Sequence, residues 1–324
     1  MTYFLHNKKV LVTGASGFIG SHLTIALLEK GAQVYTLSSN NITKSPLIDK
    51  KIAKSIKHEF VHDITDTAYI KALFKKNQFN ICFHLAAQPL VDIAEMDPTP
   101  TFEVNIKGTW NILEAARQNN LDGVIIASTT HIYGKNKLPY MEKFFPRPSR
   151  PYETSKACAD IIAQTYAQYY EMPVAIARCV NVYGPGDTNR RLVPATIKLL
   201  MSNKNPKIYA DHTTRDYMYI ADAINGYLLL AEKIKFLTKI SPNVVFNFGT
   251  GSHYTSATVI KRIIALLING ESLQLTTIPM RRQEISKQYV SIDKAKKLLG
   301  WRPKYSLNKG LRETIKWYSS HRSK

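Results

Sequence analysis

The chain has 324 residues, of which 44% are hydrophobic and 21% charged, so a disordered chain is excluded. Lys and Arg outnumber Asp and Glu by 44 to 24, and the resulting net charge of +20 favours anionic ligands. The three cysteines, Cys82, Cys158 and Cys179, are too few and too scattered for a disulfide framework or a zinc site. With no leader-like segment and no apolar run long enough for a membrane span, we expect a cytoplasmic protein without a metal.

Short apolar runs alternate with helix-length amphipathic stretches through the first half of the chain. This pattern predicts strands at 8–14, 33–38, 58–63, 80–86, 123–128 and 173–180, and helices at 21–31, 67–77, 101–119 and 152–170. Such alternation is typical of an α/β fold with a doubly wound parallel sheet. After about residue 185 we expect short helices, short strands and turns, ending in helices at 294–300 and 307–320. Two units follow, one over 1–183 and a smaller mixed α/β lobe over 184–324, with some interleaving.

A glycine-rich turn joins the first predicted strand to the first predicted helix, with glycines at positions 14, 17 and 20. Glycine permits positive φ and close approach of a ligand to the backbone. The helix that follows offers free N–H groups and the positive end of its dipole. The turn therefore indicates a dinucleotide pyrophosphate site, although a turn that serves packing alone has the same glycines.

Tyr152 and Lys156 are four residues apart at the start of a predicted helix, so they share one face. A free phenol, with a pKa of about 10, is a poor base at neutral pH, and a neighbouring ammonium group lowers that pKa. Thr129 ends the strand that precedes this helix. The arrangement indicates proton transfer by Tyr152, and the alternative is two surface side chains on a helix.

Together these motifs resemble the extended, nucleotide-sugar branch of the short-chain dehydrogenase/reductase superfamily, from residue 8 to about 318. The resemblance implies a Rossmann-like sheet in the first unit, a substrate lobe in the second, and NAD as cofactor. NADP stays open because Ser38 replaces the usual acid after the second strand. The cofactor-binding residues that the resemblance implies are Gly14, Gly17, Phe18, Ile19, Gly20, Ser38, Ser39, Asn40, Asp63, Ile64, Leu85, Ala86, Ala87, Asn105, Tyr152, Lys156 and Cys179.

The resemblance also implies the chemistry: Tyr152 takes the proton of the sugar's C4 hydroxyl, Thr129 binds that oxygen, and Lys156 orients the cofactor ribose. The next two residues, Thr130 and His131, complete the catalytic candidates. Family dehydratases carry an acid/base pair there that includes a carboxylate, so its absence slightly favours a 4-epimerase that acts through a 4-keto-hexose. A 4,6-dehydratase with His131 as base, a net 4-dehydrogenase or 4-ketoreductase, and a non-catalytic cofactor-binding protein are the alternatives.

The expected substrate is a nucleotide-diphospho-sugar, with its base and sugar left open. The resemblance implies that Arg215 and Arg282 bind the diphosphate, and the full set of substrate-binding candidates is Gln88, Thr129, Asn181, Arg191, Tyr209, Arg215 and Arg282. The helices predicted at 101–119 and 152–170 match those that pair in family dimers, so we expect a homodimer. Lys and Arg are spread over many helices, so neither nucleic acid nor a membrane is an expected partner.

Overall fold

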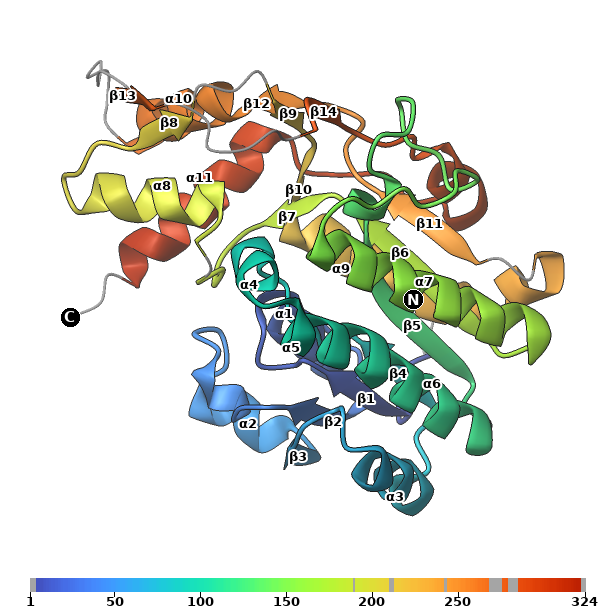
Figure 1. Ribbon diagram of the computed structural model, residues 1–324. Coiled ribbons are helices and arrows are strands. Elements are labelled where there is room, and N and C mark those ends of the chain that lie inside the picture. The colour runs from blue at the N-terminus through green and yellow to red at the C-terminus, as the bar shows by residue number, and fades with distance from the viewer. Residues whose placement is uncertain are drawn as a thin grey trace.

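A seven-stranded parallel sheet forms the centre of the computed structural model, which describes residues 4–188, 190–209, 213–241, 244–267, 276–278 and 285–321 (Figure 1). Every pair of neighbouring strands in this sheet is parallel, as the apolar strand sequences predict. In the order in which they pair, the strands are β11 (Val245–Phe248), β6 (Val174–Cys179), β5 (Gly123–Thr129), β4 (Ile81–His84), β1 (Lys9–Thr13), β2 (Gln33–Ser38) and β3 (His58–Val61).

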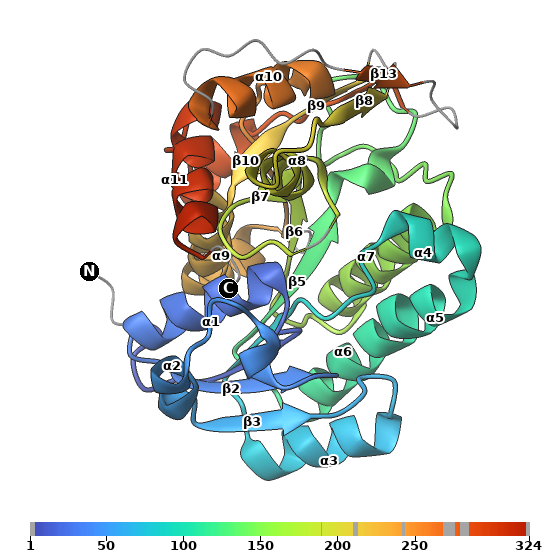
Figure 2. The same ribbon diagram turned by 90° about the vertical axis from the view of Figure 1, so that its left-hand side faces the viewer.

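Helices cover both faces of the sheet, which is why its strands are buried (Figure 2). One face is covered by α1 (Phe18–Glu29) and α9 (Ile220–Ile240), which contact each other. The other face is covered by α3 (Thr67–Asn77), α4 (Val91–Met96), α5 (Pro98–Phe102), the π-helical η2 (Glu103–Lys107), α6 (Gly108–Gln118) and α7 (Pro151–Tyr169). The doubly wound α/β prediction is confirmed. Of the described helices, none is long and apolar enough to span a membrane.

The order of the strands reverses between β1 and β4, and this reversal opens a crevice at their carboxyl ends. Gly14 follows β1, Leu85 follows β4, and Thr129 ends β5. Motifs that are far apart in the sequence therefore meet at one edge of the sheet. The short elements between the strands are η1 (Ile42–Lys44), α2 (Lys50–Ser55) and η3 (Thr130–Tyr133).

The C-terminal lobe stands above that edge and contains small sheets flanked by helices. Its pairs are β7 (Asn181–Tyr183) with β10 (Tyr217–Tyr219) and β8 (Lys207–Tyr209) with β13 (Thr276–Ile278). A third sheet has the order β12 (Tyr254–Thr255), β9 (Thr214–Arg215), β14 (Lys287–Gln288). The lobe's helical segments are α8 (Leu192–Met201), α10 (Ser256–Leu267), η4 (Ala295–Leu299) and α11 (Leu307–Ser320).

The prediction of only short elements between residue 185 and the last two helices is wrong at α9, which has 21 residues. Many of its side chains are buried because it packs on β5 and β6 of the central sheet and beside α1, so its one-sided apolar pattern is weak. Strand β11 also returns from the C-terminal part of the chain to complete the central sheet. These two elements are the interleaving that we expected, while the boundary at 183/184 stays a prediction.

Candidate active site

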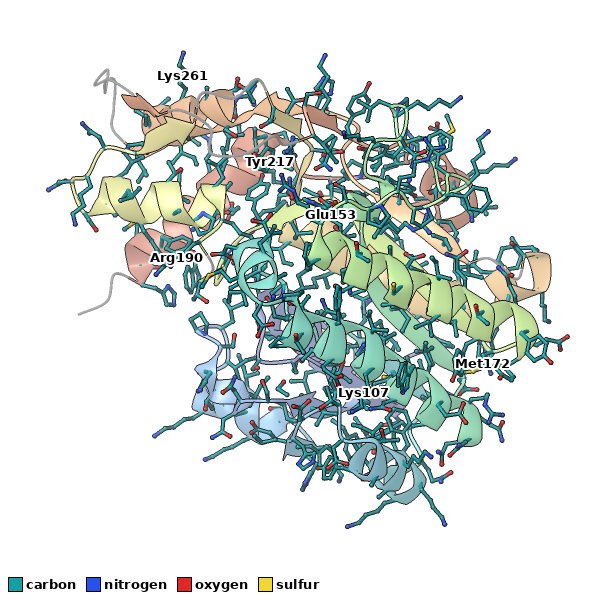
Figure 3. All side chains as sticks on the ribbon, in the orientation of Figure 1. Lys107, Glu153, Met172, Arg190, Tyr217 and Lys261 are labelled. Atoms are coloured by element: carbon teal, nitrogen blue, oxygen red, sulfur yellow. The ribbon has the colours of Figure 1, made fainter. Side chains whose placement is uncertain are left out.

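A cavity of about 1170 Å³ lies between the carboxyl edge of the sheet and the C-terminal lobe. Its wall combines residues from β5, η3, α7, β6 and the segment before α8. Figure 3 locates Glu153 where α7 begins, beside that lobe, and Arg190 ahead of α8. The predicted site residues that line the cavity are Ile19, Leu85, Ala87, Thr129, His131, Tyr152, Lys156, Cys179, Asn181 and Arg191.

The glycines of the turn allow close packing of its backbone against neighbouring backbone, where a side chain would clash. Gly14 has φ +69°, and a Cβ there would lie 2.7 Å from the backbone N of Ala86. A Cβ on Gly20 would lie 2.2 Å from the carbonyl O of Gly14. Within the described chain no side chain caps the N-terminus of α1 at Gly17, and its first turn has no acidic residue. The turn therefore fits a dinucleotide pyrophosphate, with Phe18 and Ile19 supplying first-turn backbone N–H groups.

The end of β2 lies directly beside this turn. The Ser38 hydroxyl accepts a hydrogen bond from the backbone N–H of Ser16 at 3.1 Å. Ser39 and Asn40 are exposed, and Lys44 Nζ donates to Asn40 Oδ1 at 2.7 Å. The hydroxyls of Ser38 and Ser39 and the ammonium group of Lys44 thus lie in the region where the resemblance implies an acidic residue that binds the cofactor. Two further predicted residues, Asp63 and Ile64, follow β3, where the first is exposed and the second buried.

Lys156 and Tyr152 both line the cavity, but burial governs their titration. Lys156 Nζ donates to the carbonyl O of Ala127 at 2.6 Å, and burial lowers the pKa of its ammonium to about 8, against an opposing effect of Asp160. Burial raises the pKa of Tyr152, and the positive charge of Arg191 opposes this rise. In the ligand-free protein, desolvation of the phenol therefore outweighs the nearby positive charge, while the effect of Lys156 on the pKa of Tyr152 with a bound cofactor stays a prediction.

Thr129, Thr130 and His131 pass from the end of β5 into η3, and they face different surroundings. Thr129 caps η3 by accepting from the backbone N–H of His131 at 3.3 Å, and both residues line the cavity. Thr130 is 4% exposed and is not part of the described cavity wall. Of the two residues after Thr129, only His131 is in a position to meet a ligand in the cavity.

His131 lies among polar groups from three segments. Its Nε2 is 3.4 Å from Asn181 Oδ1, and its Nδ1 is 3.9 Å from the carboxylate of Glu153. Its ring is edge-on to that of Tyr152, with centroids 6.4 Å apart. Burial opposes ionisation of Glu153, but His131, the Ser149 backbone and Arg150 together lower the pKa of this carboxyl. The sequence did not single out Glu153.

A buried chain of hydrogen bonds lies under the strand ends, and its centre is His84. Thr109 Oγ1 donates to the carbonyl O of Asn105, so it accepts from His84 Nε2, and His84 Nδ1 accepts from Thr13. This assigns the neutral Nε2–H tautomer, in agreement with a pKa lowered to about 3 by burial and by the charge of Lys156. Thr13 Oγ1 in turn accepts from the backbone N–H groups of residues 85 and 86, which fixes the loop beside the cofactor site.

Asn105 and Gln88 hold that loop and do not line the cavity. Asn105 lies in the π-helical turn η2 and is 1% exposed. Its side-chain oxygen accepts from the backbone N–H of Gln88, and its side-chain nitrogen donates to the carbonyl O of Gln88 and to the hydroxyl of Ser155. The side-chain amide of Gln88 forms hydrogen bonds with the backbone of Leu90 and with the hydroxyl of Thr101. Both side-chain amides thus position the loop in this structure, while the cofactor contact predicted for Asn105 and the substrate contact predicted for Gln88 stay predictions.

A second buried network supports the strand that carries Thr129. Arg178 is 1% exposed and donates two hydrogen bonds to Asp160, at 2.7 and 3.0 Å. Asp160 also accepts from the hydroxyl of Ser128 at 2.6 Å, and Arg178 donates to the phenol oxygen of Tyr133. Neither this network nor the position of His84 was predicted from the sequence. A charged or imidazole side chain inside an otherwise apolar strand could have indicated both, because such a group needs a buried polar partner.

The predicted substrate residues divide into two sets. Asn181 and Arg191 line the cavity, and Arg191 Nη1 lies 3.8 Å from Asp187. Arg215 is in β9 and is not part of the described cavity wall. Tyr209 is in β8, of whose side chains the structure gives no description, and Arg282 lies outside the described residues. The polar lining residues that were not predicted from the sequence are Asp92, Glu95, Ser128, Arg150, Thr188, Arg190 and Tyr227.

The family model for GDP-mannose 4,6-dehydratase matches residues 11–314. The human dTDP-D-glucose 4,6-dehydratase is 30% identical over 320 residues, which cover 96% of this chain and 90% of the relative. The UDP-glucuronate 4-epimerase of Thermodesulfobacterium geofontis is 29% identical, with 95% of each chain covered. The sequence relatives thus include both dehydratases and epimerases.

Solved structures with a similar fold also include both epimerases and dehydratases. The UDP-glucose 4-epimerase of Thermotoga maritima, with UDP-glucose, has a TM-score of 0.87 at 28% identity and covers 97% of this chain and 100% of its own. The dTDP-glucose 4,6-dehydratase of Bacillus anthracis, in complex with NAD, has a TM-score of 0.84 at 25% identity, with 97% of each chain covered. The fold is therefore common to both reactions and does not distinguish them.

Proposed function

We propose that this chain, which belongs to the GDP-mannose 4,6-dehydratase family of extended short-chain dehydrogenases/reductases, oxidises C4 of a nucleotide-diphospho-hexose and later reduces the same sugar. The observation that carries the proposal is the convergence of Thr129, Tyr152 and Lys156 on one cavity beside a glycine turn that fits a pyrophosphate. An alternative role as a non-catalytic cofactor-binding protein would not require these three residues to share a cavity wall.

The chain's own residues provide binding, orientation and proton transfer. A nicotinamide cofactor held at the glycine turn would supply hydride acceptance from C4 and hydride return. Tyr152 takes the proton of the C4 hydroxyl, and Thr129 donates a hydrogen bond to the same oxygen. The ammonium of Lys156, fixed by the Ala127 carbonyl, favours the phenolate form of Tyr152 once substrate and cofactor are present. Arg190 and Arg191 supply positive charge for the diphosphate.

Two fates of the 4-keto sugar are compatible with this site. Epimerisation at C4 needs no further acid or base, and the absence of a carboxylate at positions 130 and 131 favours it. Dehydration across C5 and C6 is the second candidate, and the specific observation in its favour is the Glu153 carboxylate 3.9 Å from His131. A net 4-dehydrogenase or 4-ketoreductase would use the same residues with an exchanging cofactor.

One experiment separates these outcomes. The purified chain is mixed with NAD and, in turn, with UDP-glucose, dTDP-glucose, GDP-mannose and CDP-glucose, and the products are analysed by mass spectrometry and NMR. Loss of one water identifies a dehydratase, and unchanged mass with inversion at C4 identifies an epimerase. Stoichiometric reduced cofactor identifies a net dehydrogenase, and NADH with the 4-keto sugars tests a ketoreductase. If no sugar is changed under any condition, the proposal is wrong.

We propose NAD as the cofactor, in line with the NAD complex of the Bacillus anthracis relative. Ser38 takes the place of the usual acid, and Lys44 lies nearby, so discrimination against NADP rests on few contacts. Fluorescence titration of the ligand-free chain with NADH and NADPH tests this preference. Tighter binding of NADPH would reverse it. A cytoplasmic, reducing location is also proposed, and the three cysteines, all free thiols, support it.

We also propose a homodimer through α5–α6 and α7. Large apolar side chains are exposed on these helices, with Trp110 at 44%, Ile161 at 51% and Tyr169 at 78%. Exposed apolar side chains of this kind favour association of two copies of the chain. Light scattering of the wild type and of Ile161→Asp tests it, and Ile240→Asp is the control because Ile240 is 50% exposed at the end of α9. A wild-type monomer would disprove the dimer.

A further inference from the structure

The contact between His131 and Glu153 joins an accessible imidazole to a buried carboxylate. The side chain of Glu153 is 5% exposed and that of His131 is 25% exposed. Glu153 is in the first turn of α7, where the helix dipole stabilises a negative charge. Its Oε2 accepts from the backbone N–H of Ser149 at 3.2 Å, while Oε1 is the oxygen nearest to His131. The carboxylate is therefore fixed behind the imidazole.

This geometry directs the two ring nitrogens of His131 to different surroundings. Nδ1 is directed to Glu153, which favours a proton on that nitrogen. The nearest atom to Nε2 is Asn181 Oδ1 at 3.4 Å, an oxygen that accepts, so this contact is made when Nε2 also carries a proton. The base form has Nε2 without that proton and the acid form has a proton on both nitrogens, and in each the proton on Nδ1 stays beside Glu153. Among the described residues, His62 and Asp66 form another histidine–carboxylate pair, but its side chains are 36% and 45% exposed on the surface. The pair at the cavity is thus distinguished by a buried carboxylate and an imidazole that a ligand can reach.

We propose that His131, oriented by Glu153, is the acid/base group that acts on C5 of the 4-keto sugar. The inference rests on the proposed function, because the C4 carbonyl is what makes the C5–H bond acidic. Nε2 takes the proton, and the electron pair of the C5–H bond enters a C4–C5 enolate whose oxygen faces Thr129 and Tyr152. His131 is the catalytic residue of this step, and Glu153 is a positioning residue.

The imidazolium then has two ways to lose its proton. It returns the proton to C5, which restores the 4-keto sugar. Alternatively it gives the proton to the hydroxyl on C6, so that the C6–O bond breaks, water leaves, and the enolate electron pair forms the C5–C6 double bond. Both routes exchange the C5 proton with solvent, since the imidazole equilibrates with water. Exchange at C5 is therefore the signature of the proposed step, whatever the final product is.

The test is deuterium incorporation at C5, measured by NMR and mass spectrometry after incubation with NAD and the same four sugar nucleotides in D₂O. Reduced cofactor, detected by its absorbance, reports C4 oxidation separately. We expect His131→Asn to slow C5 exchange by about 10²-fold or more and C4 oxidation by less than about tenfold. For Glu153→Gln we expect a loss of about 10–10² in C5 exchange, because the imidazole loses its orientation. Added imidazole should restore part of the exchange in His131→Ala.

Matched controls are His62→Asn, from the exposed histidine pair, and Glu103→Gln, from an exposed carboxylate that pairs with Lys107 at 3.4 Å. Both should leave C5 exchange and C4 oxidation unchanged. If the wild type reduces the cofactor without placing deuterium at C5, this inference is wrong and the proposed function stands. Equal losses of C5 exchange and C4 oxidation in His131→Asn would also overturn it. If neither C4 oxidation nor exchange occurs with any sugar nucleotide, the proposed function fails and the inference fails with it.

Discussion

Two polar regions meet at the carboxyl edge of the sheet, and they differ in how tightly their side chains are held. The buried framework consists of His84, Asn105, Asp160 and Arg178, whose side chains have polar partners at 2.6–3.1 Å from neighbouring elements. The partly exposed side chains of the cavity wall have longer polar contacts: 3.4 and 3.9 Å for the ring nitrogens of His131, and 3.8 Å for Arg191. Ser128 and Lys156, which are buried and also line the cavity, each have a contact of 2.6 Å and lie where the two regions meet.

The difference follows from burial. A polar group removed from water has to be hydrogen-bonded within the protein, so the framework side chains are held in one arrangement. A group on the cavity wall keeps access to solvent and to ligands, and its protein contacts do not need to be short. Polar residues of similar type at this edge therefore divide into buried ones that stabilise the fold and partly exposed ones that a ligand can reach. Substitutions in the two regions should therefore affect different quantities.

The largest effect is expected in the cavity wall. Tyr152→Phe removes only the hydroxyl that transfers the proton, so turnover should fall by about 10²–10⁴-fold. The free energy of unfolding should change by less than about 1 kcal/mol. Steady-state assays and urea denaturation measure the two quantities, and binding of the cofactor should be retained. Near-normal turnover in this variant would remove Tyr152 from the proposed mechanism.

In the buried framework, Arg178→Met should mainly reduce stability, whereas Tyr152→Phe mainly reduces turnover. This change leaves Asp160 buried without its cation, so the free energy of unfolding should fall by about 3–5 kcal/mol. Arg117→Met is the control, because Arg117 pairs with Glu114 on the surface at 38% exposure and its loss should have a much smaller effect on the free energy of unfolding. Similar losses in the two variants, measured in urea, would show that the framework is not a special source of stability.

His84→Leu tests the same region through its pH dependence. Two threonine hydroxyls lose their partner, which should cost about 1–3 kcal/mol at neutral pH. The pKa of His84 is about 3 in the folded chain, against 6.5 for an unperturbed histidine. As the pH falls from 6.5 towards 3, only the unfolded chain gains a proton at His84, so the wild type loses stability that the variant cannot lose. The difference between them should shrink from pH 7.5 to pH 5, and a constant difference would contradict the assignment of a neutral His84.

The smallest effect is expected where the two regions meet, in Lys156→Met. Burial of the ammonium opposes folding, so the ligand-free variant should be more stable by about 1 kcal/mol at pH 7, although turnover falls. The pKa of Lys156 drops from 10.5 to about 8 on folding, so this gain is complete below pH 8 and disappears as the pH rises to 10.5. Urea denaturation at pH 7 and pH 10 measures it. A destabilised variant would mean that Lys156 belongs to the framework.

Much of the central sheet could be predicted from the sequence. Six of its strands were predicted to within two residues of their bounds, although β3 is only partly apolar, and Pro151 marks the start of α7. The elements that were missed, α9 and β11, come from the C-terminal half. Strand β11 is buried along its whole length and α9 over much of its surface, so neither has the clear one-sided pattern by which a surface helix or an edge strand is recognised. Their place in the central sheet depends on contacts between distant parts of the chain.

By itself the sequence determined the parts of the site that are local. The glycines of the turn and the spacing of Tyr152 and Lys156 indicate their chemistry within a few residues, because a turn or one helical turn fixes their geometry. Only the tertiary structure decided which polar residues face the cavity. It put Gln88 and Asn105 into hydrogen bonds of the loop, put His84 between two threonines, and brought Glu153 to His131 across 22 positions of sequence. These pairings depend on how strands and helices pack, and a chain read one residue at a time contains no record of that packing.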